Sequence, residues 1–140
     1  MRRLLAPRSL PDGPRAGRGL VPRHRPLPSA HLGMPEADLE EHIREICRDV
    51  GAMRVHHLRS QGTQAGFPDD VLIGPGGVLW RELKRTRCNP TPAQDRVLEA
   101  LSAAGQDVAV WRPADLLSGR IALEITAISR LGRLMASATH

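Results

Sequence analysis

The sequence has few aromatic residues and few cysteines, and it lacks a long apolar run. Aromatic residues make up 2% of the 140 residues, with no tyrosine, so there is no platform on which successive single-stranded bases could stack. The two cysteines, Cys47 and Cys88, cannot build a disulfide framework, which fits a reducing cytoplasm. No apolar stretch approaches the roughly 18–20 residues of a membrane span. The sequence therefore argues against a disulfide-stapled domain and against a membrane-spanning helix.

Positive charge is concentrated at the start of the chain. The whole chain has 20 Lys+Arg and 15 Asp+Glu, which at first suggests a nucleic-acid binder. Residues 1–33, however, hold seven Arg and one Asp, a charge of +6, whereas the remainder holds 13 basic and 14 acidic residues, a charge of −1. Composition therefore predicts a basic tail joined to one nearly neutral domain with a modest core, at residues 34–140.

Residues 1–33 are predicted to be a disordered Arg/Pro-rich tail, because they hold six of the twelve prolines and little periodic apolar content. Three interpretations stay open. The segment is a solvated extension without a role, a basic arm that binds phosphates through charge, or a segment that is not translated. The third is open because Met34 directly precedes the first predicted helix.

The most informative segment is residues 66–84, GFPDDVLIGPGGVLWRELK. Two short apolar runs flank the turn-forming sequence GPGG, which predicts a β-hairpin. Because side chains alternate along a strand, Glu82 and Lys84 share one face, and the hairpin returns them close to Asp69. Asp70 should point away from that group. Two carboxylates and an ammonium group are what a divalent-metal hydrolase needs, since they offer oxygen ligands for Mg²⁺ and a cation for the reacting groups.

The elements around this hairpin alternate between helix and strand. Apolar periodicity predicts a helix over 35–50, a strand over 53–58, a helix from Thr91 to Gly105, a strand over 107–111 and one or two helices within 114–138. Pro35 is predicted as the first helical residue. In the second helix Val97, Leu98 and Leu101 should face the core, while Val108, Ala109 and Val110 should form a buried strand. Gly132 and the small residues after it predict fraying.

The pattern Pro68-Asp69, twelve residues, then Glu82-Leu83-Lys84 resembles the PD-(D/E)XK nuclease superfamily. Within it the chain is most similar to the VRR-NUC family, in particular the small stand-alone phage and bacterial type. The resemblance rests on GFPD, PGG, the ELK triplet and Gln94, and covers roughly residues 36–113. It implies an α/β fold with a restriction-endonuclease-like αβββαβ core, in which helices flank a mixed four-stranded sheet.

The resemblance also implies a role for individual residues. Asp69, Glu82, the backbone carbonyl of Leu83 and Glu40 on the first helix would hold Mg²⁺, for which Mn²⁺ could substitute. Lys84 would position or activate the attacking water, and Gln94 would assist. Gln94 has a structural explanation as well, because Thr91 and Gln94 have the spacing of a capping box.

Other side chains are weaker candidates. Arg85 and Arg87 leave the second hairpin strand directly and could meet phosphates, although a solvated surface explains them equally well. His56 could touch phosphate or water, but a lone histidine is usually structural. Glu36 matches a more peripheral family glutamate, and Arg112 could reach the substrate or another subunit.

The expected function is Mg²⁺-dependent hydrolysis of DNA phosphodiester bonds, in structured or duplex DNA. The alternative is a catalytically degenerate DNA-binding accessory protein, against which the intact set of Asp69, Glu82 and Lys84 argues. A sequence-specific restriction enzyme is disfavoured because no separate recognition domain is visible. DNA is the expected partner, a homodimer is left open, and the expected location is the cytoplasm of a bacterial or phage-infected cell.

Overall fold

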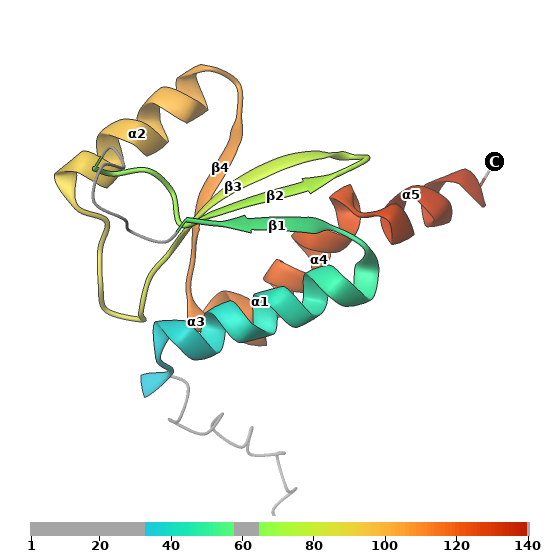
Figure 1. The fold of residues 1–140 in the computed structure, drawn as a ribbon, viewed down its shortest axis with the longest axis horizontal. Helices are drawn as coiled ribbons and strands as arrows, with labels where there is room; N and C mark the ends of the chain where they lie inside the picture. Colours follow the sequence, from blue (N-terminus) through green and yellow to red (C-terminus); the bar gives the residue numbers. More distant parts are fainter. Residues whose placement is uncertain (1–32, 58–64, 140) are drawn as a thin grey trace, which may run out of the picture.

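The computed structural model describes residues 33–57 and 65–139 of the chain. Nine elements follow one another (Figure 1): α1 Glu36–Val50, β1 Met53–His56, β2 Asp70–Gly74, β3 Gly77–Leu83, α2 Pro92–Ala103, β4 Asp107–Trp111, α3 Pro113–Leu117, α4 Arg120–Ile128 and α5 Arg130–Ser137. The predicted tail, except Gly33, and the predicted end of the first strand at Leu58 lie outside the described residues.

The four strands form one mixed sheet in the order β1-β2-β3-β4. The first three strands are antiparallel, whereas β3 and β4 run parallel because α2 connects them. Gly74 pairs with Gly77, so Pro75 and Gly76 alone form the hairpin turn. The mixed four-stranded sheet and its flanking helices confirm the predicted fold class.

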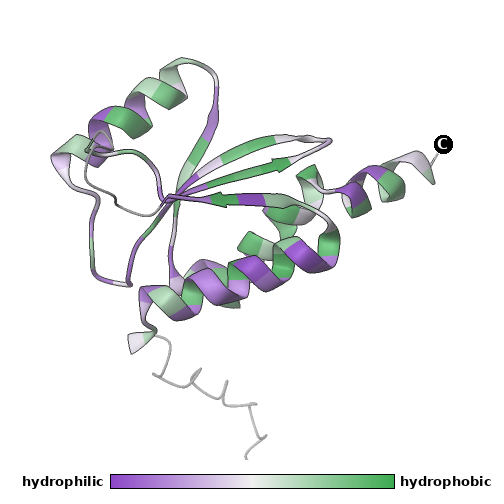
Figure 2. Cartoon of the chain, viewed as in Figure 1, coloured by the Kyte–Doolittle hydropathy of each residue, from purple (hydrophilic) through white to green (hydrophobic). Residues whose placement is uncertain are grey.

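The main hydrophobic core lies on the face of the sheet that α1 and α4 cover. Figure 2 shows hydrophobic and hydrophilic residues alternating along α1, as expected for a helix with one buried face. The buried apolar residues of this core are Leu39, Ile43, Cys47, Leu72, Leu79, Leu83, Trp111, Ile121, Ile125 and Ile128. The main apolar core of the fold therefore lies on this one face of the sheet.

The opposite face is only partly covered by α2, which contacts mainly β4. Val97, Leu98 and Leu101 are half-buried, and Gln94 is the buried residue of this helix. These three side chains face inward but lie outside the main core, so the prediction that they face the core holds only in part. Val108, Ala109 and Val110, predicted as a buried run, are half-buried too. The sheet leaves four large apolar side chains exposed: Met53, Val55, Ile73 and Val78.

Three helices occupy the C-terminal region, where one or two were predicted. Two residues separate these helices. Gly119, which has a left-handed φ of 82°, lies between α3 and α4. Ser129 lies between α4 and α5, and its side chain caps α5 by accepting from the N–H of Gly132. Gly132 is a contact point within α5 and does not mark fraying, because a Cβ there would lie 2.1 Å from the carbonyl oxygen of Thr126. Only glycine lets α5 begin so close to α4.

The first helix also starts one residue later than predicted. Pro35 has an extended ψ of 150° and serves as the N-cap, so Glu36 is the first helical residue. The helix ends as predicted at Gly51, in the left-handed conformation. None of the helices in the described parts of the chain has the length and apolar character needed to cross a bilayer.

Candidate active site

The hairpin places the three motif residues together at one end of the sheet. Asp69 directly precedes β2, and its Oδ2 accepts a hydrogen bond of 2.9 Å from the backbone N–H of Leu83. Lys84 follows β3, and its Nζ lies 2.6 Å from Oε1 of Glu82. The register of the hairpin explains why these residues meet. Glu82 and Lys84 are two residues apart and share one face of the strand, and Asp69 lies across from them, just before the neighbouring strand.

The start of α2 adds Gln94 to this group. Gln94 forms the capping box with Thr91, as the spacing predicted, and its Nε2 also donates to Oε1 of Glu82. Gly66 makes the approach of α2 possible. It has a φ of +94°, and a Cβ there would lie 2.2 Å from the carbonyl oxygen of Ala93. The loop that leads to Asp69 therefore rests directly on the first turn of α2.

Burial and charge leave Glu82 in an unusual state. Its side chain is 0% exposed, and Oε2 has no hydrogen-bond partner, whereas Oε1 receives both Lys84 and Gln94. Burial raises the pKa of Glu82 to about 7; Lys84 opposes this shift, and the negative charge of Asp69 adds to it. A buried carboxylate oxygen without a donor, next to a second carboxylate, can serve as a ligand for a cation.

A divalent cation fits this group chemically. Carboxylate and main-chain carbonyl oxygens are the ligands that Mg²⁺ prefers, and two carboxylates offset by one lysine leave a net negative charge. Within residues 33–57 and 65–139, however, no three His, Cys, Asp or Glu side chains gather as a metal-holding group. The oxygen set available to a cation is therefore Asp69 and Glu82 with the main chain of Leu83, and Glu40 does not join them.

Lys84 is the only lysine of the sequence; the other 19 basic residues are arginines. This count is a sequence signal that is separate from the motif. Arginine stays charged and presents a rigid planar fork, whereas lysine presents a compact point charge on a flexible stem. A chain that uses arginine everywhere else places its one ammonium group against Glu82, buried to 8% exposure.

Glu40 and His56 belong to a different cluster on the α1 side of the sheet. Nδ1 of His56 lies 2.8 Å from Oδ1 of Asp70, and Nε2 lies 3.5 Å from Oε2 of Glu40. Arg54 pairs with the same Asp70 oxygen at 2.9 Å. Asp70 does point away from Asp69, as predicted, but it is fully buried in an ion pair that sequence reasoning missed. The alternation of Arg54 and His56 along β1 was the available signal.

Except for Glu36, the remaining candidates lie around the connection between β3 and α2. Arg85 and Arg87 are exposed on it. Arg112 is partly exposed, and its Nη1 donates to the carbonyl oxygens of Arg85 and Cys88, so it braces the connection from β4. Arg85 and Arg87 thus form an exposed basic rim that follows Lys84, with Arg112 as its internal support. Glu36 belongs to another element: it opens α1 and is partly exposed.

Comparison with solved structures gives one similarity of interest. A structure described as a VRR_NUC domain protein is similar to this chain, with 23% sequence identity and a TM-score of 0.47; the match covers 57% of this chain and 78% of that chain. The similarity is one of fold. No protein-family model matches the chain, and no curated protein matches it.

Proposed function

We propose that this protein is a Mg²⁺-dependent endonuclease that hydrolyses phosphodiester bonds in structured or duplex DNA. The observation that carries the proposal is the unsatisfied Oε2 of Glu82, buried beside Asp69 and next to the chain's only lysine. Oδ2 of Asp70 is likewise without a hydrogen bond, but Asp70 pairs with Arg54 and His56. Glu82, in contrast, lies beside a second carboxylate, that of Asp69. A cation-binding group leaves such an oxygen free, since the ion completes it.

Each side chain has a task in this reaction. Asp69, Glu82 and the carbonyl of Leu83 would hold the cation, which when bound acts as a Lewis acid and offsets negative charge. Lys84 and Gln94 both contact Oε1 of Glu82, so they hold that carboxylate in place and would leave Oε2 available as a ligand. The Lys84 ammonium also orients the attacking water and stabilises the charge that develops on the phosphate.

DNA is proposed as the substrate on the basis of exposed positive charge and of the scarcity of aromatic residues. Arg85 and Arg87 are exposed beside Lys84, on a connection that Arg112 holds in place. Arginines in such a position bind backbone phosphates, which orients a nucleic acid without reading its sequence. The nearly neutral body lacks the aromatic residues needed to hold a run of single-stranded bases.

The decisive experiment compares Lys84→Ala with Arg85→Ala on flaps, splayed arms, four-way junctions and plain duplex, with and without Mg²⁺. Lys84→Ala should keep its fold and DNA affinity and lose at least about a hundredfold in kcat, the scale of one charge-stabilising donor. Arg85→Ala should instead weaken DNA binding in a salt-dependent way. Wild-type turnover in Lys84→Ala would refute the assignment.

The second candidate function is a DNA-binding accessory protein without activity. It predicts binding to the same DNA panel but no cleavage in Mg²⁺ or Mn²⁺.

Three further proposals accompany the main one: a folded domain at residues 34–140, a cytoplasmic location in a bacterial or phage-infected cell, and a homodimer in solution. Sedimentation at micromolar concentration tests the last.

A further inference from the structure

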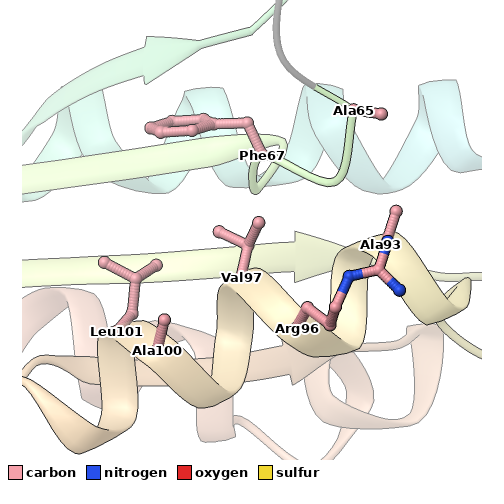
Figure 3. Close-up of a pocket in the computed structure, with 7 residues that line it drawn as sticks. All are labelled: Ala65, Phe67, Ala93, Arg96, Val97, Ala100 and Leu101. Atoms are coloured by element: carbon pink, nitrogen blue, oxygen red, sulfur yellow. The ribbon is translucent and has the colours of Figure 1, made fainter.

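A cleft of about 500 Å³ lies beside the candidate active site, between α2 and the loop before β2 (Figure 3). Its volume is within the roughly 300–1,000 Å³ of sites that take small molecules. Phe67 projects over it from the loop, as Figure 3 shows, and α2 supplies the opposite wall. The lining includes Phe67, Ala93, Arg96, Val97, Ala100 and Leu101.

The cleft and the candidate catalytic residues share both of these walls. Phe67 is two residues before Asp69, and Ala93 directly precedes Gln94, whose amide donates to Glu82. A phosphodiester held at Asp69 and Glu82 would therefore have an attached nucleoside beside the cleft. The cleft therefore adjoins the residues proposed to cut DNA. This position favours a part of the bound DNA as the occupant of the cleft.

The side chains of the cleft suit a flat, largely apolar ligand with a nearby negative charge. The Phe67 ring is held by edge-on contacts with His57 and Trp80, whose ring centroids lie 4.6 Å and 5.8 Å away. Val97 and Leu101 are half-buried below it, and Arg96 is exposed. One fixed aromatic ring can stack on one base, and an exposed guanidinium can meet a phosphate.

We propose that this cleft binds one unstacked nucleobase next to the scissile phosphate, and that the protein thereby selects DNA with an unpaired nucleotide at that position. The inference rests on the proposed nuclease function. Taking a base out of a duplex costs free energy, and the cost is smallest when the base is already mismatched or single-stranded. Flaps, bulges and junctions with an unpaired nucleotide should therefore be cut faster than a plain duplex.

The first test changes the DNA and leaves the protein intact. Once the cut is mapped, the wild-type protein is given a branched DNA with an unpaired nucleotide there, and the same DNA with an abasic residue instead. The abasic DNA should be cut with a kcat/KM about tenfold lower, within the range that one base–aromatic stack contributes. Equal rates on the two DNAs would overturn the proposal.

The second test fills the cleft. Ala100→Phe places a ring in the lining at an exposed position of α2, so it should not disturb the core. Ala103→Phe is the matched control, since Ala103 is exposed on the same helix and does not line the cleft. Ala100→Phe should lose about tenfold on the unpaired substrate and show no further loss on the abasic one. If it still distinguishes the two DNAs as the wild type does, the cleft does not read the base.

A binding measurement separates this inference from the nuclease assignment. The probe is 2-aminopurine at the unpaired position, in DNA bound by Lys84→Ala, which should leave the strand uncut. Its fluorescence should rise on binding, as the base leaves its neighbours, and the rise should be absent with Lys84→Ala/Ala100→Phe. Fluorescence that responds without any wild-type cleavage would refute the nuclease function alone; cleavage that ignores the base would refute the cleft's role alone.

Discussion

Arg81 and Glu82 are consecutive, buried residues of β3 that point to opposite faces of the sheet, and their surroundings differ completely. The five N–H groups of Arg81 make five hydrogen bonds, to the carbonyl oxygens of Trp80 and Asp107 and to the carboxylates of Asp107 and Glu124. Glu82 has one oxygen with two donors and one with none. The first residue belongs to a closed network and the second to an incomplete one.

The pKa values of the two glutamates show the same difference. For Glu124, burial would raise the pKa, but hydrogen bonds from Arg120, Trp111 and Arg81 outweigh burial and lower it. For Glu82, burial dominates and the pKa rises to about 7 despite Lys84. A network that satisfies its carboxylate fixes the fold, here by tying β3 and β4 to α4. A network that leaves its carboxylate short of positive charge can receive a cation.

The closed network around Arg81 should contribute strongly to the free energy of unfolding. Arg81→Ala removes the partner of two carboxylates and leaves a gap beside the Trp111 ring, over which the guanidinium lies 5.1 Å from the centroid. We expect a loss of about 3–5 kcal/mol in the free energy of unfolding, as for breaking a buried pair on one side. Urea unfolding of the metal-free protein measures it.

Arg120→Ala is the matched control for that loss. Arg120 also bonds to Glu124, at 2.7 Å, but its side chain is 42% exposed. Exposed pairs contribute about 0–1 kcal/mol, so this variant should stay close to the wild type. Equal losses in the two variants would mean that the burial of Arg81 adds nothing to the strength of its contacts.

In the incomplete network around Glu82, catalysis should be lost when the positive charge at residue 84 is kept but the shape of the charged group is altered. Lys84→Arg retains a positive charge, but the planar guanidinium cannot replace the ammonium point charge at 2.6 Å from Oε1 of Glu82. We expect kcat to fall by at least about a hundredfold with little change in the melting temperature. Normal turnover in Lys84→Arg would show that charge alone is needed at this position.

Glu82 should also make the metal-free protein sensitive to pH. Because the pKa of Glu82 is higher in the folded protein, at about 7, than its usual 4.5, the folded state holds the extra proton between these values. Stability from this group is therefore present at low pH and is lost as pH rises through that window. We expect the melting temperature to fall by at least about 4 °C between pH 5 and pH 8, equivalent to about 1 kcal/mol in a small domain.

Glu82→Gln is the comparison for this pH dependence, since glutamine has the size of the glutamate side chain without its charge. It should flatten the pH profile, stabilise the metal-free protein at pH 8 and abolish cleavage. Mg²⁺ should raise the wild-type melting temperature at pH 8 and leave the variant unchanged, because a bound cation favours the charged carboxylate. A wild-type profile in Glu82→Gln would locate the titrating group elsewhere.

The sequence predicted the hairpin and its three motif residues, because their placement depends only on strand alternation and turn chemistry. It predicted the capping box at Thr91 and Gln94 for the same local reason. It could not predict the partners of Arg81, because Asp107 and Glu124 lie 26 and 43 residues away along the chain. For that reason Arg81, which shares its strand face with Leu79 and Leu83, gave no sign of a closed network.

The errors of prediction also have a physical cause. Periodicity places Val97 and Leu101 on the inner side of α2, but it cannot show that a cleft lies between this helix and the loop before β2. Likewise, alternation separates Asp70 from Asp69 without showing the ion pair between Asp70 and Arg54. Asp70→Asn is therefore no silent control for Asp69→Asn, because it would leave the half-buried Arg54 without its charged partner.

The smallest expected effect concerns the seven arginines before Met34, which contrast with the buried Arg81. A chain that begins at Met34 should melt and cut like the full chain at physiological salt, since Met34 already packs against the core and α1 begins two residues later. At low salt the +6 charge of residues 1–33 should strengthen DNA binding, and the gain should fade as salt rises, because it depends on counterion release. Cleavage rate and DNA affinity of both chains, at low and physiological salt, make the comparison. Loss of cleavage in the shorter chain at physiological salt would assign those arginines a substrate-clamping role that salt does not screen.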